Sequence, residues 1–199
     1  MTLEWIRMVA LGAMALHAVF FLDAPFLTFG QKRLAWRWQE QIVLNSFELA
    51  LLMWWVMAKW RLGWERALVP AGATPAAAGA GLALVLAGVG LTVWAKLGLG
   101  RWFVAGFVIK QGHRLVTGGP YAVTRHPMYT GVLATFAGVA LVWDSALTLL
   151  LGAGFCGALF MHSVIEEALL EHHFGETWRE YRSRVPRFVP FLRPRRIAP

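Results

Sequence analysis

Long apolar runs separated by short polar and basic stretches dominate this chain. A helix that crosses the hydrocarbon of a bilayer needs about 20 mostly apolar residues. Five runs approach that length, at roughly 5–28, 42–59, 75–97, 127–143 and 145–165. Only Asp144 and Ser145 separate the last two runs, so we expect these to form an antiparallel helical hairpin. The pattern predicts an all-α, polytopic membrane protein with about five transmembrane helices.

The chain reads as a single integral membrane domain over residues 1–199. Residues 1–97 hold the first three runs, and residues 98–191 hold a Gly-rich basic loop, the hairpin and a C-terminal helix. The third run, with AAAGAGLALVLAGVG, has the small residues that allow close helix packing in lipid. No repeat or low-complexity segment is visible.

A second pattern follows the last run. Leu170, Phe174, Trp178 and Tyr181 recur at helical spacing with charged residues between them. This predicts an amphipathic helix on the membrane surface, with Gly175 as a point of interruption. The tail RFVPFLRPRRIAP, broken by prolines, is expected to be irregular.

Composition and charge support a membrane setting. The chain is 58% hydrophobic and 15% charged, against about 25% charged residues in a soluble domain. Its net charge is +8, and seven arginines follow Glu176. No nucleic-acid motif accompanies this charge, so we expect anionic membrane lipids as partners and no nucleic acid.

The distribution of basic residues also predicts a topology. The positive-inside bias places the tail and the loops 31–41 and 98–126 in the cytoplasm and the N-terminus outside. The basic residues of loop 60–74 oppose this assignment. The first run has no small-residue cleavage site and is expected to be a retained helix. The lone Cys156 excludes a disulfide framework and is expected to face the core or lipid.

The stretch GGPYAVTRHPMYTGVL, residues 118–133, places polar groups where the fourth run begins. Gly118, Gly119 and Pro120 predict a turn, and Pro127 suits the first turn of a helix. Arg125 and His126 are donors suited to a carboxylate or phosphate, and free N–H groups of a first helical turn also attract an anion. Alternatively, the two basic side chains only reach toward lipid headgroups.

A second polar group lies at the end of the fifth run. His162 and Glu166 are one helical turn apart and share a face, whereas Glu167 points about 100° away and is expected to pair with a surface arginine. The hairpin would bring this group beside the first one. His17, Asp23 and Glu48 are weaker candidates for a substrate entrance. No spacing supports a metal site, including at His172 and His173.

Two blocks carry a resemblance to a known family. HRLVTGGPYAVTRHPMYTG followed by EEALLEHHFGETWREYRSRVPRFVPF resembles the isoprenylcysteine carboxyl methyltransferases, integral membrane enzymes related to the phospholipid N-methyltransferases. The blocks occur in the expected order and spacing over residues 97–191. The resemblance implies a site for S-adenosyl-L-methionine between them, without a Rossmann sheet.

The resemblance also implies roles for individual residues. The cofactor-binding positions it implies are His113, Arg114, Leu115, Val116, Tyr121, His126, Pro127, Met128, Tyr129 and Glu166. His162, Arg125 and Tyr129 are the candidate catalytic positions. His162 stands where eukaryotic members carry an arginine that contacts the substrate carboxylate. A titratable imidazole there can hold an anion when protonated or act as a base for a thiol or amine.

The expected function is therefore methyl transfer from S-adenosyl-L-methionine to a lipophilic acceptor at the cytoplasmic face. Prenylcysteine-like carboxylate, thiol, lipid amine and an isoprenoid or quinone-like lipid all stay open as acceptors, and the sequence gives no oligomeric state. Two alternatives remain: a membrane reductase using NADPH on an isoprenoid or sterol-like lipid, and a non-enzymatic protein that binds anionic lipid.

Overall fold

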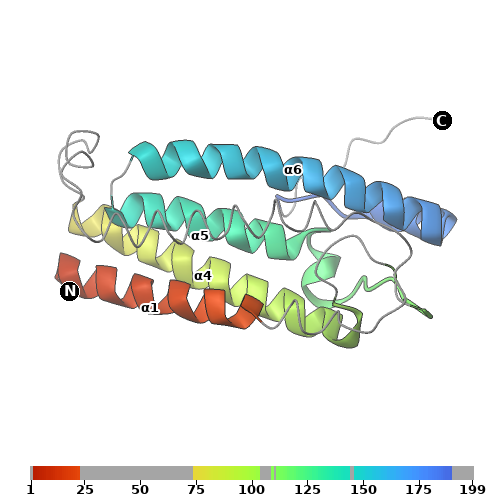
Figure 1. Cartoon of the computed structure of the whole chain (residues 1–199), viewed down its shortest axis with the longest axis horizontal. Helices are drawn as coiled ribbons and strands as arrows, with labels where there is room; N and C mark the ends of the chain where they lie inside the picture. The colour runs from red at the N-terminus through yellow and green to blue at the C-terminus, as the bar shows by residue number, and fades with distance from the viewer. Residues whose placement is uncertain (1, 23–73, 104–108, 110, 144–145, 190–199) are drawn as a thin grey trace.

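The computed structural model describes residues 2–22, 74–103, 109, 111–143 and 146–189, in which it has helices and no strands. The long helices are α1 (Leu3–Leu22), α4 (Pro75–Leu99), α5 (Pro127–Trp143) and α6 (Ala146–Phe174). They lie side by side with α4 between α1 and α5, and α6 packs on α5 (Figure 1). The side chain of His17, the residues Asp23 and Glu48, and the expected span 42–59 lie outside the described part.

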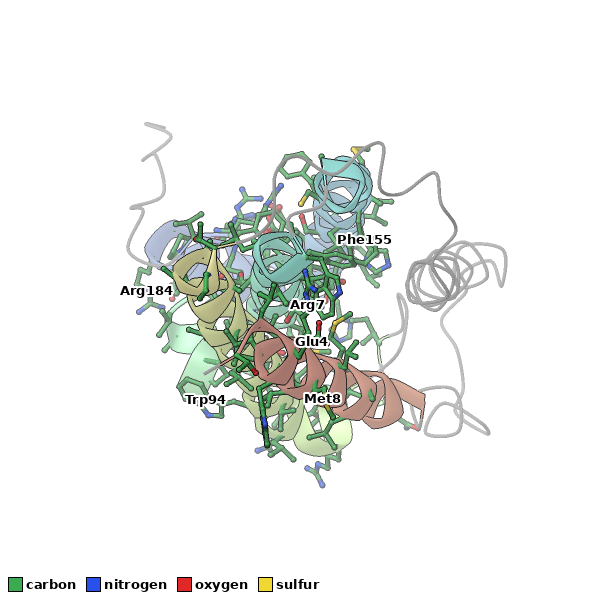
Figure 2. All side chains as sticks on the ribbon, turned by 90° about the vertical axis from the view of Figure 1, so that its left-hand side faces the viewer. Glu4, Arg7, Met8, Trp94, Phe155 and Arg184 are labelled. Carbon is green, nitrogen blue, oxygen red and sulfur yellow. The ribbon has the colours of Figure 1, made fainter. Side chains whose placement is uncertain are left out.

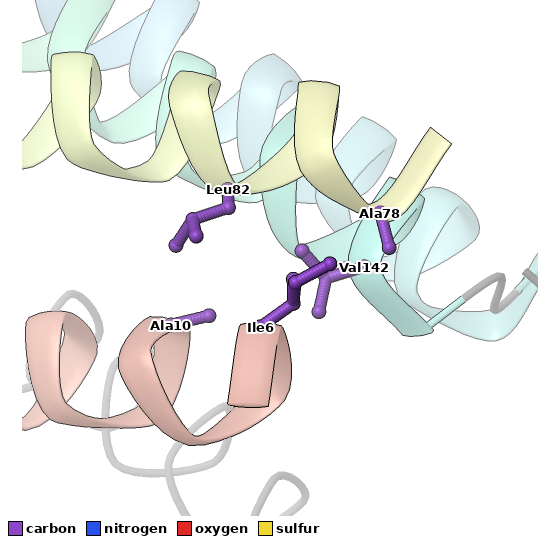
Figure 3. Close-up of a cluster of buried hydrophobic side chains, with 5 residues drawn as sticks. All are labelled: Ile6, Ala10, Ala78, Leu82 and Val142. Carbon is purple, nitrogen blue, oxygen red and sulfur yellow. The ribbon is translucent and has the colours of Figure 1, made fainter. Parts of the chain in front are cut away.

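Helix α1 runs parallel to α4. Ile6 and Ala10 of α1 pack against Ala78 and Leu82 of α4, with Val142 from the end of α5 closing the cluster (Figure 3). Helix α4 begins where the sequence provides an N-cap, because Thr74 Oγ1 accepts a hydrogen bond from the amide of Ala77 at 3.2 Å and Pro75 follows.

Helices α4 and α5 form the tightest packing in the described part. Gly81 faces Gly138, and Gly88 faces Gly131, in one antiparallel register. A Cβ at Gly81 would lie 2.6 Å from the carbonyl oxygen of Gly138, closer than real Cβ contacts come. The small residues of the third run therefore allow the close helix packing that the sequence predicted, because they let the two backbones touch.

Helix α6 is longer than the pattern predicted. The apolar run was expected to end near residue 165, with a separate amphipathic helix carrying Leu170 and Phe174. Instead α6 continues to Phe174, and Gly175, at φ +54°, separates it from α7 (Glu176–Arg184). Leu170 and Phe174 therefore belong to the long helix. The apolar composition ends near residue 165, but the helical conformation continues beyond it.

Among the described residues, two helices are long and apolar enough to cross a membrane by length and composition, Pro75–Trp102 and Gly152–Phe174. Helix α5 is apolar but shorter. Large apolar side chains remain exposed on the outer faces, among them Met8 and Trp94, the latter on the outside of the bundle in Figure 2. The lone Cys156 is exposed on α6 as well, one of the two environments expected for it.

The connection between α4 and α5 contains two short 3-10 turns, η2 (Gly100–Trp102) and η3 (Gly119–Ala122). Gly119, at φ +59°, allows the turn that leads through Pro120, as the sequence predicted. After α7 the chain runs back across the start of α5. We call residues 185–189 the strap.

Candidate functional site

The site begins at the N-terminus of α5. The carbonyl of His126 accepts the first helical hydrogen bond, from Thr130 at 3.0 Å, and Pro127 occupies the position whose missing N–H has no helical partner. The amides that precede the helix are used by the strap. Arg125 N–H donates to the carbonyl of Pro186 at 2.8 Å, and His126 N–H donates to that of Arg187 at 3.1 Å.

Two threonine hydroxyls complete the attachment of the strap. Thr124 Oγ1 donates to the carbonyl of Arg187 at 2.7 Å, and Thr130 Oγ1 donates to that of Phe188 at 2.9 Å. The first residues of the tail are thus ordered against α5, although the prolines predicted an irregular segment. The strap is irregular in conformation, but its carbonyls from Val185 to Phe188 all accept hydrogen bonds.

Glu167 is the centre of a buried charge cluster. Its Oε1 accepts from Arg125 Nε, His126 Nε2 and Arg187 Nε, each at 3.0 Å, and its Oε2 accepts from Arg187 Nη2 at 2.8 Å. The expectation that Glu167 pairs with an arginine is correct, but the pair is not at the surface, because Glu167 is only 3% exposed. Two arginines and a histidine supply the compensation that a buried carboxylate requires.

Arg125 ties three parts of the chain together. Besides Glu167, its Nη1 donates to the carbonyls of Arg182 at 2.9 Å and Val185 at 2.8 Å, at the end of α7. Burial lowers the pKa of Arg125, and the charge and hydrogen bonds of Glu167 oppose that effect. The guanidinium therefore contacts the protein's own acceptors along most of its edge.

His126 lies between two carboxylates. Its Nε2 is 3.0 Å from Glu167 Oε1, and its Nδ1 is 3.5 Å from Glu166 Oε2. Burial by itself lowers the pKa of His126, but the hydrogen bonds and charges of Glu166 and Glu167 outweigh it and the pKa is raised. The raised pKa favours the protonated imidazolium, in which both ring nitrogens are donors.

A second hydrogen-bonded group connects α5 to α6. The hydroxyl of Tyr129 is 2.7 Å from His162 Nδ1 and donates to Glu166 Oε2 at 2.9 Å. The ring of Tyr129 stacks on His126 with 5.2 Å between centroids and meets His162 edge-on. Within the described residues, the bonds to Glu166 fall on Oε2, and its side chain is 38% exposed. The other oxygen, Oε1, is thus open to a ligand.

The segment from His113 to Val116 lies beside the later turns of α6. The ring of His113 stands between Trp102 and Phe174, with centroids 5.3 Å and 6.0 Å away. Leu115 packs against the buried cluster of Trp178, Tyr181 and Val185, together with Leu170 and Phe174. Leu115 and Val116 are half-buried, and Arg114 is exposed at this edge.

Tyr121 joins the loop to α7. Its backbone carbonyl accepts from the hydroxyl of Tyr181 at 2.7 Å, and its own side chain is buried. Burial and the charge of Glu166 raise the pKa of Tyr121. Burial also raises the pKa of Tyr181. Both phenols therefore stay neutral and serve as polar but uncharged walls.

The structure thus brings together at one end of the bundle the residues singled out from the sequence. Arg125, His126, Tyr129, His162 and Glu166 form one connected group, with Pro127 buried and Met128 half-buried beside them. Sequence reasoning missed the strap and Arg187. The sequence showed Arg187 only as one of the seven arginines after Glu176, and these were interpreted together as a basic tail.

These features define a protein whose described residues form helices and no strands, with a polar cluster where α5 begins and α6 approaches its end. The phospholipid methyltransferase family model matches residues 76–177, which contain most of this cluster. The chain belongs to the phospholipid methyltransferase family.

Curated relatives match over the same part. Protein-S-isoprenylcysteine O-methyltransferase B of Arabidopsis thaliana is 32% identical over 115 residues, which cover 56% of this chain and 58% of the relative. Protein-S-isoprenylcysteine O-methyltransferase of Homo sapiens is 34% identical over 90 residues, covering 41% of this chain and 29% of the relative. The chain therefore spans little more than half the length of these relatives at most.

A solved structure shares the fold. The eukaryotic intramembrane Ras methyltransferase, isoprenylcysteine carboxyl methyltransferase, superposes with a TM-score of 0.58 at 23% sequence identity. The superposition covers 94% of this chain and 66% of that one.

Proposed function

We propose that this protein is an integral membrane methyltransferase that uses S-adenosyl-L-methionine and acts on a lipophilic acceptor. The convergence of His126, Tyr129, His162 and Glu166 at one end of the bundle is the observation that carries the proposal. These are polar groups that a lipid-embedded helix pair would not gather without a polar ligand. The family assignment and the names of the relatives support the same conclusion.

The residues present fit the proposed cofactor. Its amino group and ribose hydroxyls are donors, and Glu166 offers the open acceptor Oε1 for one of them. Its carboxylate needs a cation, and Arg114 is an exposed cation at the edge of the segment His113–Val116. Its adenine and sulfonium suit aromatic surfaces such as Tyr121, Tyr129 and His113. When bound, the cofactor supplies an electrophilic methyl group on a cationic sulfur.

The protein's own part in such a reaction is binding, orientation and exclusion of water. Tyr129 fixes the Glu166 carboxylate from one side and His126 fixes it from the other. Glu167, Arg125 and Arg187 hold the strap over the start of α5 and so keep His126 in place. In this proposal they act on the ligand through the residues that they position.

The membrane arrangement is part of the proposal. Five spans, with the N-terminus outside and the site and tail at the cytoplasmic face, agree with the basic residues near the site. Exposed apolar side chains on α6, Phe160, Met161 and Val164, flank His162 and offer a route for an acceptor that arrives from the bilayer. A lipophilic small molecule or a lipidated protein meets this requirement.

Calorimetric titration of the detergent-purified protein with S-adenosylhomocysteine, beside NADPH, tests the proposal. We expect saturable binding of S-adenosylhomocysteine that Glu166→Ala abolishes. Binding of NADPH alone would instead favour a membrane reductase. A folded protein that binds neither, but binds anionic vesicles through its tail arginines, would favour a lipid-binding protein without enzymatic activity.

A further inference from the structure

Tyr129 lies between two partners and carries only one hydroxyl proton. Its oxygen is 2.7 Å from His162 Nδ1 and 2.9 Å from Glu166 Oε2. An ionised carboxylate can only accept, so the Tyr129 proton is directed to Glu166. The tyrosine oxygen must then accept from His162, which places a proton on Nδ1 of that ring.

The argument requires Glu166 to be ionised, and its neighbour favours this state. His126 Nδ1 is 3.5 Å from Glu166 Oε2, and His126 Nε2 is 3.0 Å from Glu167 Oε1. These two carboxylates raise the pKa of His126 against the effect of burial, which favours a positive charge beside Glu166. A nearby opposite charge stabilises the ionised form of a carboxyl group.

A neutral imidazole with its proton on Nδ1 has its lone pair on Nε2. We propose that Nε2 of His162 is the base that takes a proton from the methyl acceptor, and that the acceptor is a lipophilic thiol or amine rather than a carboxylate. This inference rests on the proposed methyltransferase function. It deepens that function by naming the chemistry of the acceptor.

The acceptor chemistry follows from its proton. A carboxylic acid, with a pKa of about 4, is already ionised at neutral pH and needs no base. A thiol has a pKa of about 8.5 and an alkyl amine about 10.4, so both carry a proton that must leave. In the described part, the hydroxyl of Tyr129 on α5 contacts Nδ1 of His162 and bridges it to Glu166 on α6, and the ring of Tyr129 stacks on His126, so the ring of His162 is oriented through its Nδ1.

The step balances in atoms and electrons. The S–H or N–H bond of the acceptor breaks, and its proton passes to His162 Nε2. The freed electron pair forms the new bond to the methyl carbon, whose bond to the donor sulfur breaks with its electron pair left on that sulfur. The imidazolium of His162 afterwards returns the proton to water.

The tautomer is measured first, because it does not depend on turnover. The full chain, labelled with ¹⁵N-histidine and held in detergent with S-adenosylhomocysteine, gives ring nitrogen shifts that distinguish protonated from bare nitrogens. His162→Asn assigns the signals by loss of one set. We expect protonated Nδ1 and bare Nε2 in His162 at neutral pH. A proton on Nε2 with bare Nδ1 would overturn the inference.

Acceptor assays provide the second test, with farnesyl thiol, farnesylamine and N-acetyl-S-farnesylcysteine as thiol, amine and carboxylate probes. His162→Asn keeps an N–H at the position of Nδ1 but has no base. We expect wild type to methylate the thiol or the amine, and the variant to lose about 100-fold or more of kcat/KM while binding S-adenosylhomocysteine as wild type does. The probe that is turned over distinguishes thiol from amine.

Two results would overturn the inference and leave the proposed function standing. One is methylation by wild type of the carboxylate probe alone. The other is unchanged kcat/KM of His162→Asn on the thiol and the amine. Absence of S-adenosylhomocysteine binding to the folded wild type would instead remove the proposed function itself, and this inference with it.

Discussion

Glu166 and Glu167 are adjacent in sequence and face opposite nitrogens of one imidazole. Glu167 Oε1 lies 3.0 Å from His126 Nε2, while Glu166 Oε2 lies 3.5 Å from His126 Nδ1. Successive residues of a helix point about 100° apart, so the two carboxylates approach the ring from different sides. Glu167 is bonded through both oxygens to the protein, whereas Glu166 leaves one oxygen open.

Substituting these two residues should therefore have different consequences. Glu167→Gln removes the charge that compensates Arg125 and Arg187 in a buried setting, and we expect the free energy of unfolding to fall by about 3 kcal/mol or more. Glu166→Gln should change that free energy by less than about 1 kcal/mol and weaken S-adenosylhomocysteine binding by about tenfold or more. Denaturation and calorimetry in detergent measure both. Equal losses of stability in the two variants would contradict these assigned roles.

Stability should depend on pH through His126. Because its folded pKa is raised, protonated His126 contributes its full stabilisation below the unfolded pKa of about 6.5. That contribution is lost as pH rises through the higher folded pKa. The difference in Tm between wild type and His126→Gln should thus be largest near about pH 5.5 and shrink toward about pH 9. The charged groups around the ring, Glu166, Glu167, Arg125 and Arg187, are present in both proteins. A difference that grows with pH would show that the ring is held neutral.

The strap should loosen when Arg187 is changed. Arg187→Gln removes both hydrogen bonds to Glu167, so we expect faster hydrogen exchange at the amides of Arg125 and His126, which donate to the strap. Arg184→Gln is the matched control, because Arg184 lies at the outer edge of the molecule (Figure 2) and its pairing with Glu180 is exposed. Equal exchange in the two variants would mean that the backbone bonds alone hold the strap.

Glycine pairing between α4 and α5 should be sensitive to a single methyl group. A Cβ at Gly88 would lie 2.7 Å from the amide nitrogen of Thr135, so Gly88→Ala must separate the helices. We expect a loss of about 1–3 kcal/mol in the free energy of unfolding. Gly90→Ala, on the same helix with open space around it, should leave Tm unchanged or slightly higher. Similar effects of the two substitutions would contradict the close contact.

The sequence predicted helix α5 well and helix α6 less well, for a physical reason. Pro127 and Asp144 bound the fourth run, and α5 begins at Pro127 and ends at Trp143. Nothing of that kind stands at residue 165. The hydrophobic pattern indicates where the surroundings of a helix change, not where the helix ends. Helix α6 keeps its backbone hydrogen bonds where its residues become polar. Helix α6 ends just before Gly175, which has a positive φ.

The candidate site was predictable in its members and not in its connections. Arg125 and His126 could be placed near His162 and Glu166 because the hairpin is short, and His162 and Glu166 could be placed on one face because they are one helical turn apart. The partners of Glu167 include Arg187, which follows it by 20 positions and reaches it only through the turn at Gly175 and the fold of the strap. Local spacing rules do not report contacts of that kind, so the arginine resembled any other residue of a basic tail.

The paired glycines of α4 and α5 have a mechanical consequence. With backbone against backbone, and with Thr92 and Thr135 bonded back to the carbonyls of Gly88 and Gly131, these helices can neither slide nor rotate past one another without a collision. Helices α4 and α5 therefore pack as one rigid unit. Under the proposed function, a bulky acceptor must then enter along another boundary between helices. The interface between α5 and α6 is such a boundary. Within the described residues, the rings of Phe136 and Phe155 contact across it, and Tyr129 bonds across it at one end.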